Sequence, residues 1–224
     1  MLDRFKQFWQ GVMLAPFINL FIRLGISPDV VTVVGTLGVS AGALVFFPQG
    51  MLWQGVLVIA AFVFSDLIDG AMARKMGRKD DFGAFLDSTL DRVADGALFG
   101  GLELYFAWHA ESLLYLVLCL VILLMGAVTS YARAKAEGLG YDAKVGIAER
   151  PDRLVGMLVP AFFADVLDLP ILLEIALWAL AVAATVTVVQ RVWVVRGQAL
   201  ARAASQALSR RRVLGPRAVG SAHG

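Results

Sequence analysis

Charged residues are scarce in this chain of 224 residues: Asp, Glu, Lys and Arg make up 17% of it, against roughly 25% in an average soluble domain. Cysteine is nearly absent. Cys119 is the only one, which excludes an intrachain disulfide and a cysteine metal cluster, and its place in an apolar run predicts core packing. The N-terminus lacks the short apolar core and cleavage site of a signal peptide, so we expect it to be retained. Hydrophobic residues, by contrast, make up 59%, which favours one helical domain in lipid.

Six apolar runs are long enough to cross a hydrocarbon layer of about 30 Å, which takes roughly 20 helical residues. They lie near 29–48, 51–74, 84–107, 112–137, 152–169 and 172–196. Aromatic and charged residues alternate over 3–23, which indicates a helix lying in the membrane interface, or else an ordinary packed helix. The sequence therefore predicts an all-α, polytopic membrane protein in three parts. These are an interfacial amphipathic helix over 1–25, a domain of six transmembrane helices over 26–197, and a basic, partly disordered tail over 198–224.

The basic residues are distributed unevenly between the two sides of this layout. The loops 49–50, 108–111 and 170–171 contain no Lys or Arg, so all 20 basic residues fall on the other side. The positive-inside rule then predicts a protein of the cell's inner membrane with both termini in the cytosol. Gly38-x3-Gly42 and Gly96-x3-Gly100 permit close helix approach within the bundle or across a dimer. We expect a homodimer surrounded by membrane lipids, and no nucleic-acid partner.

Four carboxylates stand within the second and third runs. Asp66 and Asp69 share one face of the second, and Asp87 and Asp91 share one face of the third. A short loop joins the two runs, so the two pairs can converge. A lone carboxylate at such depth costs at least ~2.5 kcal/mol, and four together repel one another unless a cation neutralises them. An oxygen-only donor set suits Mg²⁺ or Mn²⁺, and two ions would balance the four charges and clamp a phosphoryl group.

Other interpretations of these acids stay open. Arg74, Lys75 or Arg92 could pair with one or two of them. Asp95 continues the stripe from Asp91, either in support of the metal ligands or as a polar contact between helices. Asp80 and Asp81 lie on the loop, where solvation is the default. A cation transporter also buries acids among helices, although its site usually lies near the midplane between repeated halves.

The spacing Asp66-x2-Asp69-Gly70-x2-Ala73-Arg74-x8-Gly83-x3-Asp87-x3-Asp91 resembles the signature of the CDP-alcohol phosphatidyltransferase family at every fixed position. The resemblance covers roughly residues 3–196 and implies transfer of a phosphatidyl group from CDP-diacylglycerol to an alcohol. It implies that the four aspartates hold two metal ions and that Asp91 is also the general base. It further implies a CDP-lipid pocket formed by Asp29, Thr32, Gly70, Ala73, Arg74, Asp80 and Gly83, with Asp80 standing where the family often has a small hydroxyl residue.

The motif also bears on the kind of reaction. It contains no Ser, Cys or His placed as a nucleophile, which favours a single in-line displacement over a covalent intermediate. Asp91 would then take the proton from the acceptor hydroxyl as that oxygen attacks the lipid-side phosphorus and CMP departs.

Basic residues and hydroxyls near the cytosolic ends of the later runs predict an acceptor that carries its own phosphate. The segments SYxRAKAE (130–137) and ERPxRL (149–154) resemble the branch of the family that uses inositol phosphate. The branch that uses glycerol phosphate carries the same aspartate motif and stays the alternative. The resemblance implies acceptor-phosphate ligands at Ser130, Arg133, Lys135, Arg153 and Arg191. Lys144 and Arg150 are equally explained by a basic surface that meets lipid headgroups.

Overall fold

The computed structural model describes residue 16 and residues 18–75 and 81–214. These residues form helices joined by short connections, with no strand among them. The helices are α2 (Pro28–Phe46), the 3-10 helix η1 (Phe47–Gln49), α3 (Leu52–Lys75), α4 (Asp81–Trp108), α5 (Leu113–Gly138), α6 (Arg150–Val166) and α7 (Ile171–Leu214). The side chains of residues 64–67, 69, 70, 73 and 74 in α3, and of 210–214 in α7, lie outside the described part.

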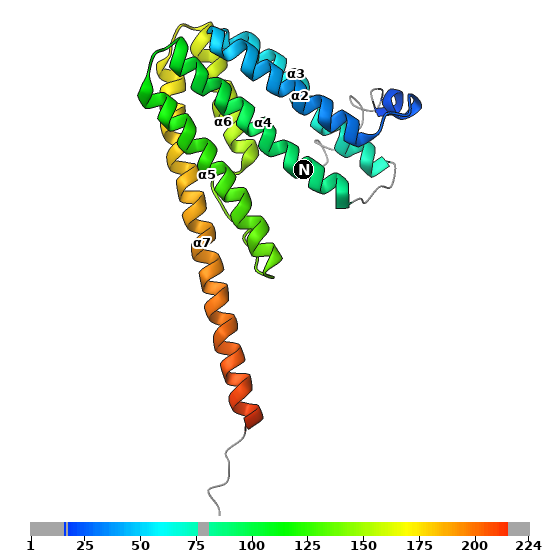
Figure 1. Cartoon of the computed structure of the whole chain (residues 1–224), viewed down its shortest axis with the longest axis vertical. Helices are drawn as coiled ribbons and strands as arrows, with labels where there is room; N and C mark the ends of the chain where they lie inside the picture. The colour runs from blue at the N-terminus through cyan, green and yellow to red at the C-terminus, as the bar shows by residue number, and fades with distance from the viewer. Residues whose placement is uncertain (1–15, 17, 76–80, 215–224) are drawn as a thin grey trace, which may run out of the picture.

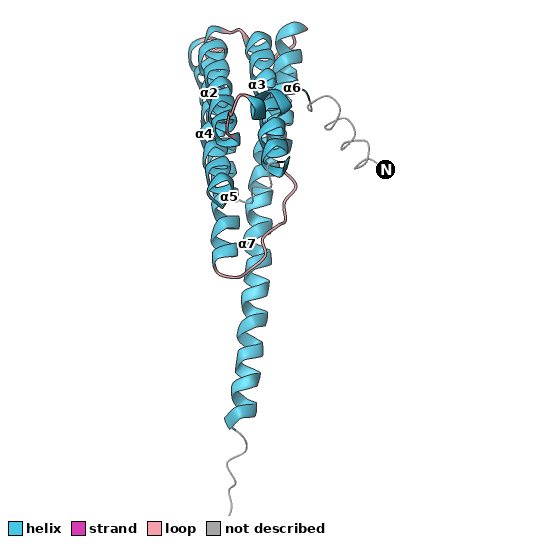
Figure 2. Cartoon of the chain, turned by 90° about the vertical axis from the view of Figure 1, so that its right-hand side faces the viewer, coloured by secondary structure: helices cyan, strands magenta, loops and turns pink. Residues whose placement is uncertain are grey.

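The helices converge at one end of the bundle and diverge toward the other. Figure 1 shows the α2–α3, α4–α5 and α6–α7 connections together at the converged end. From there α2, α3 and α4 run to one side, while α5 and α7 run to the other. These three connections contain the loops that lack Lys and Arg, so the basic residues of the connecting segments gather where the helices diverge. The view in Figure 2 shows the same helices as an up-and-down bundle from which α7 projects.

Local sequence signals set the limits of the first helices. Ser27 caps α2, because its side chain accepts a hydrogen bond from the backbone N–H of Val30 (3.3 Å), and Pro28 occupies the first turn. After η1 the chain turns at Gly50, whose φ is 77° and whose N–H donates to the carbonyl of Phe47 (2.9 Å). A Cβ at Gly50 would overlap the imidazole of His109. The left-handed backbone and the close contact both require glycine there.

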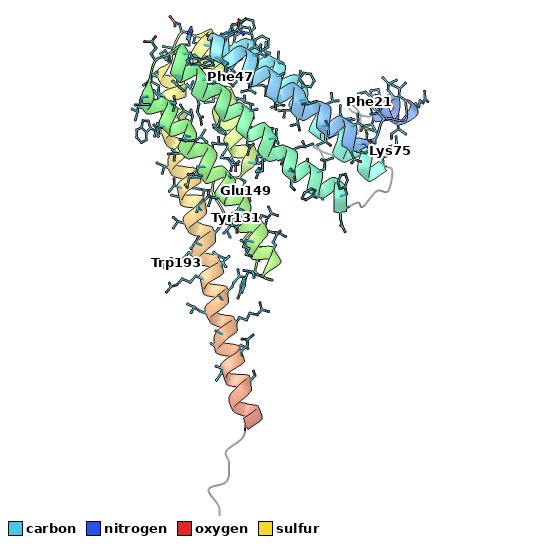
Figure 3. All side chains as sticks on the ribbon, in the orientation of Figure 1. Phe21, Phe47, Lys75, Tyr131, Glu149 and Trp193 are labelled. Carbon is cyan, nitrogen blue, oxygen red and sulfur yellow. The ribbon has the colours of Figure 1, made fainter. Side chains whose placement is uncertain are left out.

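The hydrophobic core lies at the converged end. Phe47, Phe99 and Met157 are fully enclosed there, with Phe47 labelled in Figure 3. Helices α2 and α4 approach closely, since a Cβ at Gly101 would lie 2.7 Å from the carbonyl oxygen of Ala43. This close packing fixes one end of the bundle, and with it the directions in which the helices diverge at the other end.

The predicted helix positions are confirmed for the first five runs, whose observed limits lie within three residues of the predicted ones. Three helices in the described part are long and apolar enough to cross a membrane: Pro28–Gln49, Leu113–Gly138 and Ile171–Ser209. The all-α class and the membrane character are therefore confirmed.

Helix α7 is longer than predicted. It continues from the predicted limit at 196 to Leu214 and has 44 residues, which at 1.5 Å each is about 66 Å. The extension is rich in alanine, the strongest helix former, at Ala199, Ala201, Ala203, Ala204 and Ala207. Its first turns also have partners: Gln198 exchanges hydrogen bonds with the backbone N–H (2.9 Å) and carbonyl (2.6 Å) of Asp142, and Arg202 donates to the carbonyl of Leu139 (3.2 Å). The tail residues after Leu214 lie outside the described part.

Most of the predicted interfacial helix over 3–23 lies outside the described residues. Its last turns are helical, and Ile18 is buried against Val31 of α2 and Met72 of α3. The two glycine patterns differ in their surroundings. A Cβ at Gly38 or Gly42 would press on α3 of the same chain, whereas Gly96 and Gly100 have no neighbour within 4 Å among the described atoms.

Candidate functional site

A pocket of about 680 Å³ opens between α4, α5, α6 and α7, on the diverging side of the core. Tyr131 and Glu149, which Figure 3 labels, mark its walls on α5 and at the start of α6. Most of its lining side chains carry a charge or a hydroxyl. They are Ser88, Asp91, Arg92 and Asp95 from α4; Thr129, Ser130, Tyr131, Arg133 and Glu137 from α5; Glu149, Arg150 and Arg153 around the start of α6; and Arg191 from α7.

Asp91 and Asp95 bring two carboxylates of α4 to this pocket, one helical turn apart. Arg150 bridges them: its Nη1 lies 2.7 Å from Asp91 Oδ1, and its Nε lies 3.1 Å from Asp95 Oδ1. The other oxygen of Asp95 accepts from Arg153 Nη2 at 3.2 Å. Asp95 is only 5% exposed, so its charge is balanced by guanidinium groups inside the protein. Along this wall the ion pairs therefore run in the order Asp91, Arg150, Asp95 and Arg153.

Arg92 joins α4 to α5 at the mouth of the pocket. Its Nη1 donates to the Ser130 hydroxyl, which in turn donates to the carbonyl of Gly126 (3.2 Å). Its Nη2 lies 3.5 Å from Asp95 Oδ2. The side chain is one third exposed, so this ion pair contributes less than the buried contact between Asp95 and Arg153.

Two buried arginines form the inner part of the pocket. Arg153 is 2% exposed and Arg191 is 3% exposed. Arg191 donates from Nε to the carbonyl of Val145 and from Nη1 to the carbonyl of Thr129, both at 2.8 Å, and its Nη2 lies 3.5 Å from Glu149 Oε1. Backbone carbonyls therefore hold the guanidinium in a fixed orientation. Two fixed guanidinium groups facing one cavity favour the binding of an anion with several oxygens.

The loop before α6 is held in place by one hydroxyl of α7. Thr187 Oγ1 accepts from the N–H groups of Ile147 (3.2 Å) and Ala148 (3.0 Å), and the residue is fully buried. A side chain at Gly146 would overlap Thr187. At the start of α6, the N–H of Glu149 donates to Asp152 Oδ2 at 3.0 Å, which caps the helix. These contacts fix the register in which Arg150 and Arg153 point into the pocket.

Gly126 leaves the space that Arg153 occupies. A Cβ at Gly126 would lie 3.0 Å from Arg153 Nε and 3.1 Å from its Cζ. Because the guanidinium is enclosed, we expect Gly126→Ala to destabilise the protein by about 1–3 kcal/mol through overpacking. Thermal unfolding in detergent measures this effect. Gly138→Ala is the control on the same helix, since no described atom lies within 4 Å of that Cβ position. Equal melting temperatures for the two variants would contradict the prediction.

The structure brings four of the five predicted acceptor-phosphate ligands together in the pocket: Ser130, Arg133, Arg153 and Arg191. The fifth, Lys135, is exposed on α5 and does not line this pocket. Among the predicted metal ligands, Asp91 lines the pocket and Asp87 is exposed one turn before it on α4.

The remaining predicted residues lie on α2, α3 and the start of α4. Asp66, Asp69, Gly70, Ala73 and Arg74 belong to α3 with side chains outside the described part, and Asp80 lies outside it altogether. Asp29, Thr32 and Gly83 are in the first turns of α2 and α4. The convergence of the two aspartate pairs and the composition of the CDP-lipid pocket therefore stay predictions.

Sequence reasoning did not select Arg92 and Arg150 as site residues. The structure places both in the pocket, paired with Asp95. One signal was available for each. Arg92 precedes Asp95 by three residues and Arg150 precedes Arg153 by three, and helical residues at this spacing share a face.

Comparisons with known proteins identify the family of this chain. The family model for CDP-alcohol phosphatidyltransferase matches residues 25–189, which is more than half of the chain. The chain belongs to the CDP-alcohol phosphatidyltransferase family. The matched range includes the aspartate motif and Arg153, and ends just before Arg191.

Relatives within this phosphatidyltransferase family are similar over most of their length. A phosphatidylinositol phosphate synthase of Streptomyces avermitilis is 48% identical over 202 residues, which are 88% of this chain and 83% of the relative. One of Cutibacterium acnes is 47% identical over 88% of this chain and 98% of the relative. Two solved structures of the Mycobacterium tuberculosis phosphatidylinositol phosphate synthase are 41% identical. The one with CDP-DAG bound has a TM-score of 0.79 and covers 82% of this chain and 93% of its own. The one with manganese and citrate has a TM-score of 0.78 and covers 82% and 88%.

Proposed function

We propose that this chain transfers the phosphatidyl group of CDP-diacylglycerol to the hydroxyl of inositol phosphate, giving phosphatidylinositol phosphate and CMP. Membership in the CDP-alcohol phosphatidyltransferase family supports the reaction class. The names of the relatives and the CDP-DAG bound in one of their structures support the two substrates.

One observation supports an acceptor that carries a phosphate: the pocket that contains Asp91 also contains the buried guanidiniums of Arg153 and Arg191. Burying two cations is unfavourable unless partners offset it. A phosphate monoester dianion supplies such a partner and accepts hydrogen bonds from several donors at once. The described lining contains five arginines and four acids, and an acceptor without a phosphate would leave this excess of positive charge without a counter-charge. A cavity of about 680 Å³ is within the usual size range for small-molecule sites.

The metal ligands of the proposed enzyme are Asp66, Asp69, Asp87 and Asp91. The described donors fit a hard divalent cation, because Asp87 and Asp91 offer carboxylate oxygens one turn apart on α4. We place two Mg²⁺ ions there, with Mn²⁺ as a substitute, and a relative solved with manganese supports a divalent ion. Bound ions of this kind neutralise the charge on the diphosphate and on the departing CMP.

The protein's own groups bind, orient and deprotonate the acceptor. Arg153 and Arg191 hold its phosphate together with Ser130 and Arg133 of the pocket lining, and Lys135 is a further candidate from the exposed side of α5. Asp91 takes the proton of the attacking hydroxyl, and its contact with Arg150 orients the carboxylate. The hydroxyl oxygen forms a bond to the lipid-side phosphorus, the bond from that phosphorus to CMP breaks, and CMP leaves with the electron pair. Asp29, Thr32, Gly70, Ala73, Arg74, Asp80 and Gly83 hold the CDP-lipid.

The proposal also includes a membrane topology. All six helices from α2 to α7 cross the inner membrane, and the diverging end with its basic residues faces the cytosol, where both termini lie. We also propose a homodimer. A Cβ added at Gly96 or Gly100 of α4 would meet no described atom within 4 Å, which leaves room for a second copy to approach closely.

An acceptor comparison tests the proposed reaction. The purified protein is assayed for CMP release from CDP-diacylglycerol with Mg²⁺ and either inositol phosphate, glycerol phosphate or free inositol. We expect release with inositol phosphate and little with the other two. Faster release with glycerol phosphate would assign the protein to the other branch of the family.

Ligand protection separates the enzyme from a cation transporter. CDP or CMP with Mg²⁺ should raise the unfolding temperature above that with Mg²⁺ alone, because a ligand that binds only the folded state stabilises it. Protection by the cation alone, without an additional effect of nucleotide, would contradict the proposal.

A further inference from the structure

One buried hydroxyl of the pocket has no hydrogen-bond partner in the described part of the chain. Thr129 on α5 is 3% exposed and lines the pocket, and among the described residues no hydrogen-bond partner is present for its Oγ1. Buried polar atoms in folded proteins are nearly always hydrogen-bonded. An exception inside a binding pocket therefore indicates a group that serves a ligand.

Thr129 differs from most other helical Ser and Thr residues of the described part in its hydrogen bonding. Most of them donate to the backbone carbonyl four residues earlier, the usual solution within a helix. They are Thr32, Ser88, Thr89, Ser130, Thr185 and Thr187, with oxygen–oxygen distances of 2.8 to 3.2 Å. Thr129 directly precedes Ser130, yet it makes no such bond. Its buried hydroxyl is therefore left without a hydrogen-bond partner among the described residues, on a residue that lines the pocket.

The surroundings of Thr129 define the chemistry of the missing partner. Its own carbonyl accepts from Arg191 Nη1 at 2.8 Å. Gly126, three residues earlier and on the same face of α5, lies against the guanidinium of Arg153. The hydroxyl thus belongs to a stretch of helix that contacts both buried arginines. Two guanidiniums and a hydroxyl donor together match the oxygens of a phosphate.

We propose that the Thr129 hydroxyl donates a hydrogen bond to the acceptor's phosphate, between Arg153 and Arg191. This inference rests on the proposed function, because it assumes that a phosphate monoester enters this pocket. It adds a specificity-determining residue for that substrate. The role requires the hydroxyl itself, whereas a packing role would require only the shape of the side chain.

Thr129→Val and Thr129→Ser separate these two roles. Valine keeps the branched shape and removes the hydroxyl, and serine keeps the hydroxyl. We expect Thr129→Val to raise the KM for inositol phosphate by about 10- to 100-fold, the usual effect of losing a hydrogen bond to a charged group. The inhibition constant of inorganic phosphate should rise by the same factor, and the KM for CDP-diacylglycerol should stay unchanged. Thr129→Ser should keep both phosphate-dependent constants near wild type.

Thr185→Val is the matched control. Its hydroxyl is bonded to the carbonyl of Ala181 (2.8 Å) and does not line this pocket, so this variant should leave all three constants unchanged. Three results would overturn the inference. One is wild-type constants in Thr129→Val; another is equal impairment in Thr129→Ser. The third is a raised KM with an unchanged inhibition constant for phosphate, which would place the contact on the inositol ring.

Direct binding of inorganic phosphate, followed by calorimetry, separates this inference from the proposed function. If wild type binds phosphate and Thr129→Val binds it more weakly, the contact is supported even where inositol phosphate is not turned over. If both bind phosphate equally, the inference fails even where the transfer reaction is confirmed.

Discussion

Asp91→Asn is expected to lower kcat by about 10³-fold, within the range found when a general base is removed. Asp91 is the described aspartate of the motif that lines the same pocket as the buried arginines, and its Oδ1 lies 2.7 Å from Arg150 Nη1. Asparagine has the same shape but cannot take a proton from the acceptor. Initial rates of CMP release at saturating substrates measure the effect.

Nucleotide binding is the accompanying measurement. Thermal protection by CDP should persist in Asp91→Asn, because the proposed CDP-lipid pocket is built from other residues and Asp66, Asp69 and Asp87 remain as proposed metal ligands. Asp168→Asn is the control. Asp168 lies at the converged end of the bundle with a φ of 53°, a conformation that asparagine tolerates. Wild-type turnover in Asp91→Asn, or an equal loss in Asp168→Asn, would contradict the assignment of Asp91 as the base.

The helices were predictable because each one contains an apolar run bounded by charges or turn residues. Hydropathy indicates only which residues suit the lipid. The apolar run ends at residue 196, so the predicted helix ended there too. The extension to Leu214 depends on alanine propensity and on the contacts of Gln198 and Arg202 with the preceding loop. Those contacts join residues more than 50 positions apart, which no local pattern reveals.

Site residues were predictable where a charged residue stood within an apolar segment or a recognisable motif. Arg191 is a charge inside an apolar helix, Arg153 was implied by the ERPxRL resemblance, and both lie in the pocket. Arg150 stands at a helix start, where a basic residue is ordinary, and its direction depends on how Thr187 holds the loop before it. Lys135 shows the converse. Its segment resembles that of the family, but the structure places its side chain on the exposed side of α5.

Asp95→Asn is expected to lower the stability of the protein, because Asp95 is the counter-charge of three arginines. It accepts from Arg150 Nε at 3.1 Å and from Arg153 Nη2 at 3.2 Å, and Arg92 Nη2 lies at 3.5 Å. Asp95→Asn removes the negative charge and leaves the guanidiniums to repel one another. Removing one partner of a buried ion pair costs about 3–5 kcal/mol. At the lower figure, the unfolding temperature of a protein of this size should fall by roughly 6–12 °C.

Glu137→Gln is the control for Asp95→Asn. Glu137 pairs with Arg133 at 3.1 Å, but both side chains are more than 40% exposed, so this variant should cost less than about 1 kcal/mol. Equal shifts in the two variants would contradict the importance of the buried charge.

A double variant identifies the cause of the expected loss. In an Arg153→Gln background, Asp95→Asn should be much less destabilising than in wild type, because the most deeply buried guanidinium, at 2% exposure, is no longer there to be left without a counter-charge. The fall in unfolding temperature of the double variant should be smaller than the sum of the falls in the two single variants. Additive losses would mean that the effect of Asp95 does not pass through Arg153. The acid at 95 would then support the helix contact without setting the orientation of Arg153 toward the acceptor.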